Sequence, residues 1–175
     1  MFSILVDQQY LQQSYLLSKN YKNRFNCIAV KKIYLVLEHL PLTLFVLLIY
    51  IWNESSNTFF IYLIFFFGWL NDIDHLIDYG VFLYRFKKKI SINYFFSGKY
   101  FKKNKKIYLL LHSYEITFFL LLIGIILDKE GMFFVTFAHL LHLAQDQFKN
   151  DVNKYSYFFI YRINKDFNFK KICSS

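Results

Sequence analysis

Four long apolar runs, separated by polar segments, set the pattern of this chain. In each run the apolar residues are contiguous and do not alternate with polar ones, which is typical of helices in a fully apolar environment rather than of half-exposed strands. Each run holds 17 to 21 residues, close to the roughly 20 that a helix needs to cross a bilayer core. The pattern predicts an all-α fold, a four-helix transmembrane bundle, with spans at about 33–52, 59–79, 107–127 and 132–148.

The composition favours the same class of protein. Hydrophobic residues make up 56% and aromatic residues 23% of the 175 positions, more apolar side chain than a soluble domain of this length can bury. We therefore expect one membrane domain over residues 33–148. A cytoplasmic segment, residues 1–32, would precede it, and a cytoplasmic or interfacial tail, residues 149–175, would follow. The longest loop of the domain would be the connection 80–106.

The distribution of Lys and Arg predicts the orientation. Four spans place both termini and the connection 80–106 on one side of the membrane, and the loops 53–58 and 128–131 on the other. Of the 21 Lys and Arg residues, only Lys129 falls in those two loops. Because positive charge gathers on the cytoplasmic side, we expect a multi-pass protein of the cell (inner) membrane with both termini in the cytoplasm.

Basic and aromatic residues are mixed throughout the connection 80–106, and aromatic residues recur in the tail. Such mixtures are typical of amphipathic segments that lie on anionic lipid headgroups. Membrane lipids are therefore the expected partners. Nucleic acid attracts the same residue types, but beside two predicted spans we do not expect it as a partner.

Ionisable residues inside the apolar runs are the main candidates for chemistry, because in lipid they are costly unless paired or bound to a cation. On the predicted topology all of them fall toward the cytoplasmic ends of the spans, and all five histidines of the chain are among them. The set is Glu38, His39, Asp72, Asp74, His75, Asp78, His112, Glu115, His139, His142 and Asp146.

Helical spacing predicts that these side chains share inward faces. His139, His142 and Asp146 follow one another at three and four positions, and His112 precedes Glu115 by three, so each group forms a stripe along one helix. Bundles build metal sites by turning such stripes toward a common axis. The sequence therefore predicts one polar site at the cytoplasmic end of the four spans.

Imidazoles and carboxylates without thiolates favour a divalent metal, with Zn expected first and Mn or Fe as alternatives. The expected ligands are Asp72, Asp74, His75, His112, His139 and His142. Glu115 is the expected general base. Asp146 is expected to take part in catalysis, either as a ligand or by orienting one. Surplus donors would orient ligands or hold a second ion.

Three further residues have a second interpretation beside metal binding. Glu38 and His39 can be interfacial residues at the end of a span, and Asp78 can be solvated where its helix leaves the membrane. We therefore treat these three as possible additional ligands.

Short motifs in this set resemble a known family. Asp72-Ile73-Asp74-His75, then His112-Ser113, then His139 with Asp146 are similar to the motifs of the bacterial and archaeal membrane-bound, metal-dependent hydrolases. The resemblance covers about residues 33–165 and is to a small uncharacterised branch. It implies a small multi-pass inner-membrane metallohydrolase.

The leading functional hypothesis is a hydrolase that acts at the cytoplasmic face on an ester or phosphoester of a lipid or lipid-linked molecule. An alternative is a non-catalytic, metal-stabilised membrane protein or an accessory subunit of envelope-polymer assembly. A lipid phosphotransferase is less favoured, because the chain has a single Asp-rich cluster and histidines where such enzymes use carboxylates around Mg²⁺.

Overall fold

A computed structural model of the chain describes residues 38–53, 57–150 and 152–173. The predicted segment 1–32 and the first residues of the predicted first span lie outside these ranges. Helices dominate the described residues, which contain no strand beyond one isolated bridge between Lys106 and Asn168. The all-α prediction is thus confirmed. The elements are α3 (Leu40–Trp52), α4 (Thr58–Gly68), the 3-10 helix η1 (Leu70–Asp74), α5 (His75–Phe86), α6 (Ile92–Phe96), α7 (Lys99–Asn104), α8 (Tyr114–Leu127), α9 (Glu130–Lys149), α10 (Phe159–Asn164) and α11 (Phe169–Cys173).

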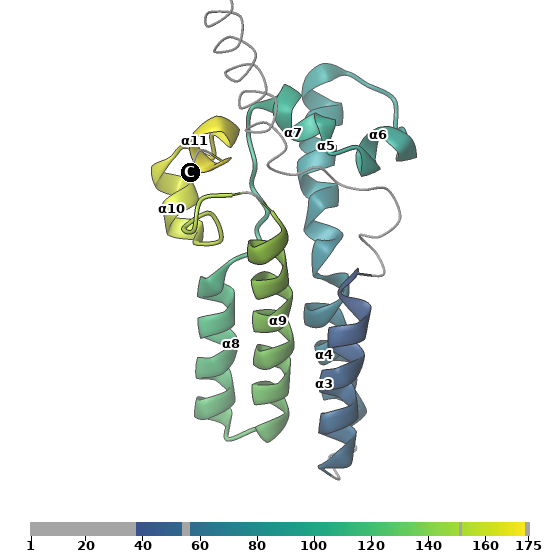
Figure 1. Ribbon diagram of the computed structural model, residues 1–175, viewed down its shortest axis with the longest axis vertical. Helices are drawn as coiled ribbons and strands as arrows, with labels where there is room; N and C mark the ends of the chain where they lie inside the picture. Colours follow the sequence, from purple (N-terminus) through teal and green to yellow (C-terminus); the bar gives the residue numbers. More distant parts are fainter. Residues whose placement is uncertain (1–37, 54–56, 151, 174–175) are drawn as a thin grey trace, which may run out of the picture.

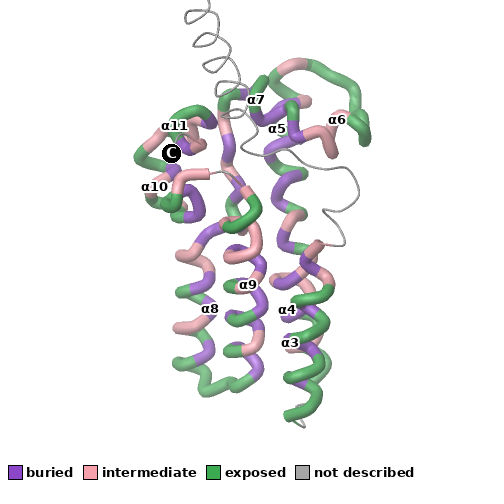
Figure 2. The backbone as a smooth tube through the Cα atoms, viewed as in Figure 1, coloured by how far each residue is buried: buried purple, intermediate pink, exposed green. Residues whose placement is uncertain are grey.

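One half of the elongated molecule consists of α3, α4, α8 and α9 (Figure 1). Helix α9 packs against each of the other three. Its small residue Ala138 and its Val135 lie in a core with Val46 and Ile64, all of them buried. Along these helices buried and exposed stretches alternate (Figure 2), as expected where one face of each helix packs and the other does not.

The other half is built from short helices. Helices α5, α6 and α7 lie on one side and α10 and α11 on the other, with the chain between α7 and α8 passing between them (Figure 1). A second core, largely aromatic, fills this half and includes Tyr79, Phe82, Phe101 and Phe169. The aromatic residues of the connection and tail thus supply a core, in addition to any contact that they make with headgroups.

The predicted second span, 59–79, is broken. Helix α4 ends at Gly68, η1 follows, and the axis of α4 makes an angle of 61° with the helical stretch Leu70–Phe86. Close packing explains the use of glycine at this point, because a Cβ on Gly68 would lie 2.7 Å from Thr43 Oγ1. The bend turns Asn71 and Asp74, both fully buried, toward the interior.

The predicted third span, 107–127, begins later than expected. Helix α8 starts at Tyr114, and Ser113 accepts a 3.4 Å hydrogen bond from the amide of Ile116 at its N-terminus. Residues 107–113 form no helix. The amides of Tyr108, Leu109 and Leu111 bond instead to side chains from α5 and η1, as described below, so tertiary hydrogen bonds replace those of a helix.

A helix that crosses a bilayer must be about 20 residues long and apolar over that length. Among the described residues no single helix meets the requirement, and α4 meets it only together with the bent stretch Leu70–Phe86. Helices α3 and α8 are apolar but shorter, with 13 and 14 residues.

Candidate metal centre

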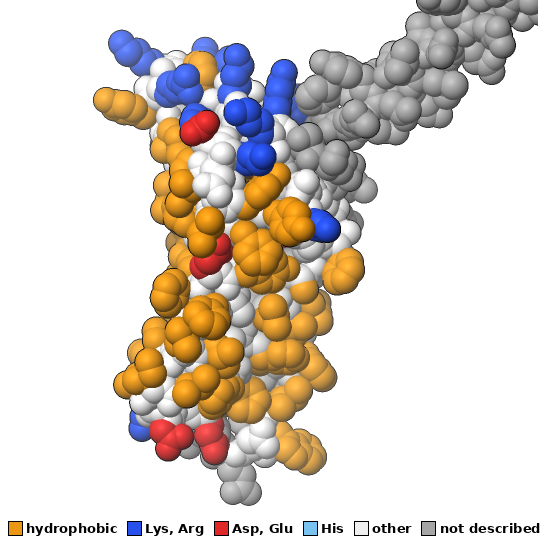
Figure 3. All heavy atoms as spheres, turned by 90° about the vertical axis from the view of Figure 1, so that its left-hand side faces the viewer, with side chains coloured by type: hydrophobic (Ala, Val, Ile, Leu, Met, Phe, Trp, Pro, Cys, Tyr) orange, Lys and Arg blue, Asp and Glu red, His pale blue; other side chains and the backbone are white. Residues whose placement is uncertain are grey.

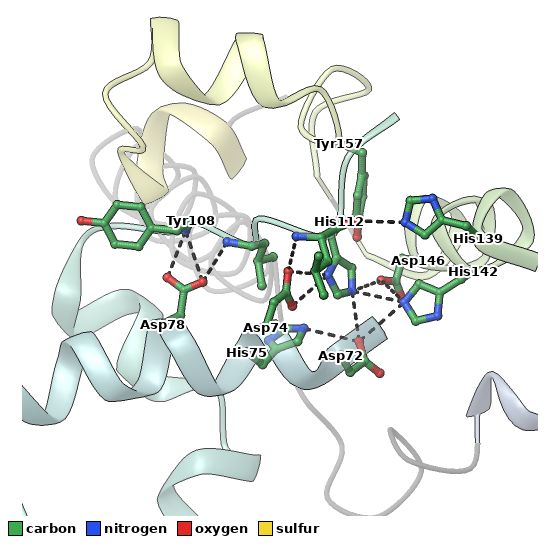
Figure 4. Close-up of polar contacts among 12 residues, drawn as sticks. Asp72, Asp74, His75, Asp78, Tyr108, His112, His139, His142, Asp146 and Tyr157 are labelled. Carbon is green, nitrogen blue, oxygen red and sulfur yellow. Dashed lines mark hydrogen bonds and ion pairs between the residues drawn. The ribbon is translucent and has the colours of Figure 1, made fainter. Parts of the chain in front are cut away.

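Four histidines and two aspartates converge at the junction of the two halves. His39 directly precedes α3, Asp72 lies in η1, and His75 is the first residue of α5. The remaining three come from the stretch before α8 and from α9. We call the six residues the His/Asp cluster; its members are His39, Asp72, His75, His112, His142 and Asp146. Figure 4 shows five of them, all but His39, turned toward one another.

The Nε2 atom of His112 lies at the middle of the cluster. It is 3.0 Å from Asp72 Oδ1, 3.3 Å from Asp146 Oδ2 and 3.2 Å from His142 Nε2. Asp146 Oδ1 lies 3.3 Å from His39 Nε2. Nitrogen and oxygen donors bound to one metal at about 2.0–2.2 Å lie roughly 3.0–3.4 Å apart when they are neighbours in the coordination shell. These spacings match that range.

In His112 and His142 the second ring nitrogen, Nδ1, forms a hydrogen bond on the side away from the cluster. His112 Nδ1 lies 3.0 Å from Asp74 Oδ2, and His142 Nδ1 lies 3.1 Å from the carbonyl oxygen of Gly68. A carboxylate and a carbonyl only accept, so both rings carry a proton on Nδ1 and donate it. Their Nε2 atoms are thereby turned toward the cluster as ligands, the arrangement that metal-binding histidines ordinarily have.

His75 and His39 are held in different ways. The hydroxyl of Tyr100 lies 3.4 Å from His75 Nδ1, and burial raises the pKa of Tyr100, so that this hydroxyl keeps its proton. The ring of His39 stacks on that of His142 with 3.8 Å between centroids. His39 Nδ1 is buried and has no hydrogen-bond partner among the described residues.

The donor atoms form two overlapping sets, and within each set they lie within 4.8 Å of one another. One set is His39, Asp72, His142 and Asp146; the other is Asp72, His75 and His112. The histidines of the cluster are buried, while the side chains of Asp72 and Asp146 keep 19% and 15% of their surface exposed. The structure therefore contains a buried His/Asp cluster that can hold a metal ion, with its accessible edge at the two carboxylates.

Two predicted ligands lie behind the cluster instead of within it. Asp74 Oδ2 accepts from the amide of Leu111 at 2.8 Å as well as from His112. His139 Nε2 donates to the carbonyl of Leu111 at 3.0 Å, and its Nδ1 accepts from the hydroxyl of Thr117 at 2.8 Å. Both ring nitrogens of His139 are thus occupied, and Asp74 and His139 together fix the backbone beside His112.

The other predicted residues make contacts away from the cluster. Asp78 accepts from the amides of Tyr108 and Leu109, each at 2.9 Å. Glu115, the expected general base, accepts from the amides of Phe159 and Ile160 at 2.8 and 3.0 Å. Its carboxylate therefore holds the first turn of α10.

Glu38 pairs with Lys149 near the end of α9, and its backbone carbonyl accepts from the side chain of Gln145. This residue thus ties the start of α3 to α9. Of the three possible additional ligands, the structure brings His39 into the cluster and places Glu38 and Asp78 outside it.

Arg162 supports the centre and was not predicted to do so. It is 1% exposed, and its guanidinium donates to the carbonyls of Tyr108, Leu109 and His112 at 2.8, 2.6 and 2.8 Å. Burial lowers its pKa to about 10, which still leaves it protonated at neutral pH. Only a lone Arg in an aromatic stretch signals this role in the sequence.

Comparison of the chain with protein-family models, with curated protein sequences and with solved structures found no match. The geometry of the His/Asp cluster is therefore the ground for proposing a function.

Proposed function

We propose that this chain is a membrane-bound, metal-dependent hydrolase that acts at the cytoplasmic face on an ester or phosphoester of a lipid or lipid-linked molecule. One observation carries the proposal. Donor atoms from four separate chain segments meet in one cluster: those of Asp72, His142 and Asp146 lie 3.0–3.3 Å from His112 Nε2, and Asp146 lies 3.3 Å from His39 Nε2. The order of the motifs, which resembles that of membrane-bound, metal-dependent hydrolases, supports the same class.

A divalent ion, when bound, supplies Lewis acidity that polarises the substrate oxygen and makes water acidic enough to attack near neutral pH. The histidines would hold the ion, with Zn expected first. Asp72 and Asp146 would bind it as well and, being partly exposed, can accept a proton from the attacking water. In hydrolysis a bond forms from the water oxygen to phosphorus or carbon. The bond to the leaving alcohol breaks, and the alcohol oxygen takes a proton.

The surface favours a membrane location. Large apolar side chains on α3, α4 and α8 are exposed, among them Leu48 at 67%, Tyr62 at 74% and Ile126 at 76%. Figure 3 shows apolar side chains covering one face between an end rich in Lys and Arg and a tip with a few charges. Apolar surface on this scale marks contact with lipid or with other protein.

We propose that the half made by α3, α4, α8 and α9 is a four-helix transmembrane bundle of the inner membrane. The basic half would then face cytoplasmic headgroups, and the His/Asp cluster would lie at the boundary between the two halves. A substrate with a lipid anchor would reach the exposed edge of the cluster from the membrane.

Elemental analysis of detergent-purified protein tests the metal centre. We expect bound divalent metal in the wild type and its loss in His112→Ala and His142→Ala. Asp128→Asn is the matched control, because Asp128 is exposed in the turn after α8 and Asn tolerates its left-handed backbone, φ 49°. Undiminished metal in both histidine variants would overturn the proposal.

A second candidate is a non-catalytic, metal-stabilised membrane protein. The observation in its favour is the number of donors, since six protein ligands can fill the shell of a single ion and leave no position for water. Activity assays on metal-loaded protein separate the two functions. We expect hydrolysis of bis-p-nitrophenyl phosphate or p-nitrophenyl butyrate that His142→Ala abolishes; a purely structural metal would give a loss of thermal stability without any hydrolysis to lose.

A further inference from the structure

We infer that the His/Asp cluster is a dinuclear centre in which Asp72 bridges two divalent ions, and that its substrate is a phosphoester. The inference rests on the proposed metal centre and specifies its stoichiometry and substrate class.

The first ground is the division of the donors into two sets. His39, Asp72, His142 and Asp146 form one, and Asp72, His75 and His112 form the other. Asp72 belongs to both. A carboxylate has two oxygens and can bind one ion with each, so a shared aspartate between two donor sets is the arrangement that a bridging ligand requires.

The second ground is the direction of the two Asp72 oxygens. Oδ1 lies 3.0 Å from His112 Nε2 and 3.6 Å from His75 Nε2. Oδ2 is the oxygen paired with His39, 4.0 Å from its Nε2. Oδ1 therefore faces the two histidines of the second set and, at 3.7 Å, also His142 of the first set. Oδ2 faces His39 of the first set.

The two oxygens of Asp146 also contact different histidines. Its Oδ1 lies 3.3 Å from His39 Nε2, and its Oδ2 lies 3.3 Å from His112 Nε2 and 3.8 Å from His142 Nε2. Both carboxylates thus reach from the side of His39 to the side of His112. Two carboxylates placed in this way span a pair of ions more naturally than they chelate one.

The third ground is the number of donors. If six protein donors all bound one ion, they would complete an octahedral shell and leave no position for water or substrate. Shared between two ions, the same six leave open positions on both. A catalytic centre needs such positions, so two ions reconcile the donor count with the proposed activity.

Charge then specifies the substrate. Two divalent ions bring four positive charges, whereas Asp72, Asp146 and the supporting Asp74 bring three negative ones. The loaded centre is therefore suited to an anion. Paired ions also stabilise the attacking and the leaving oxygen of an in-line displacement at phosphorus. In that step water adds to phosphorus, the bond to the leaving alcohol breaks, a water proton passes to a carboxylate, and the alcohol oxygen is protonated.

Metal stoichiometry tests the dinuclear centre. Chelator-stripped protein in detergent is reloaded with Mn²⁺, desalted and analysed for metal per chain. We expect two equivalents in the wild type and in the control Asp128→Asn, and one in His39→Ala and in His75→Ala, since each removes a ligand of one set. One equivalent in the wild type would overturn the dinuclear centre and leave the proposed function standing. No bound metal would overturn both.

A measurement without variants keeps the test independent of folding defects. The electron paramagnetic resonance spectrum of the Mn²⁺-loaded wild type should show exchange coupling between two ions. The spectrum of isolated Mn²⁺ at full loading would contradict the bridge.

The substrate class is tested with inorganic phosphate and acetate as probes. Phosphate should perturb the spectrum of the Mn²⁺-loaded protein at concentrations at which acetate has no effect. An equal response to both anions, or no response to either, would overturn the assignment to phosphoesters.

Discussion

Asp74 shows how a residue beside the centre can decide the chemistry within it. Its carboxylate accepts from His112 Nδ1 and from the amide of Leu111, and so fixes both the tautomer of the ring and the backbone that carries it. The sequence predicts Asp74 as a ligand, because periodicity cannot tell a group that binds an ion from one that orients its neighbour.

Asp74→Asn should weaken metal binding without creating a cavity, because the two side chains are of similar size. The amide nitrogen of Asn would face His112 Nδ1, which favours the tautomer with the proton on Nε2 and removes that atom as a ligand. Loss of a group that orients a ligand costs about 10–100-fold in metal affinity. Competition with a chelator measures the affinity, and an affinity equal to that of the wild type would contradict the role assigned to Asp74.

Glu115 and Asp146 were both expected to act in catalysis, and the structure separates them. Asp146 lies in the His/Asp cluster, whereas Glu115 holds two amides at the start of α10. We expect Glu115→Gln to keep its bound metal and lose about 1 kcal/mol of stability, because the amide nitrogen of Gln cannot accept and leaves one of the two backbone N–H groups without its acceptor. Asp146→Asn should lose metal. Metal analysis and thermal unfolding distinguish the two variants, and the reverse pattern would restore Glu115 to the centre.

At the scale of elements, the contact between α3 and α4 determines where His142 finds its acceptor. Gly68 lies against Thr43, and its carbonyl accepts from His142 Nδ1. The hydroxyl of Thr43 donates to the carbonyl of His39 at 2.8 Å, so this side chain cannot turn aside without losing that bond. Packing of the two helices and placement of His39 and His142 in the His/Asp cluster are therefore linked.

Gly68→Ala should destabilise the protein by about 1–3 kcal/mol, because the added methyl group overpacks the contact with Thr43. It should also lower metal affinity. Gly80→Ala is the matched control, since a Cβ on Gly80 meets no atom within 4 Å and the residue is exposed within α5. That change should be neutral or stabilise by up to about 1 kcal/mol. Equal unfolding temperatures for the two variants would contradict this account.

The apolar runs correctly predicted helices that depend on local sequence. They predicted a helix wrongly where distant side chains form hydrogen bonds with the backbone. Helices α8 and α9 lie within or close to the predicted third and fourth spans. The stretch 107–113 continues the apolar run of the third predicted span but is not helical. Asp74 and Asp78 accept from its amides, and Arg162 donates to its carbonyls. Hydrophobic periodicity carries no information on such bonds, because their donors and acceptors lie tens of residues away.

The candidate site was likewise predictable in part from the sequence. Grouping of all five histidines at one depth indicated the cluster, and His39, His75, His112 and His142 meet there. His139 was expected on the same stripe as His142. It bonds instead to Thr117 and to the carbonyl of Leu111, because residues three apart on a helix can contact different neighbouring segments.

At the scale of the whole molecule, positive charge gathers at one end, and exposed apolar side chains cover the half made by α3, α4, α8 and α9. If the apolar half inserts in lipid, the protein should stay with the membrane fraction in both 1 M salt and alkaline carbonate, because neither disrupts apolar contact. Salt alone would release a protein held only by its lysines. Quantitative blotting of pellet and supernatant measures the partition, and release by either treatment would contradict insertion.

The clamp that Arg162 places on the carbonyl of His112 joins residues 50 positions apart. During synthesis every residue of the His/Asp cluster therefore emerges before Arg162, whose side chain binds the carbonyl of His112. A nascent chain, or one cut short after α9, would carry all six ligands and still lack the ordered backbone that presents them. If the proposed metal centre is correct, a chain that ends after α9 should therefore bind metal more weakly than the full chain.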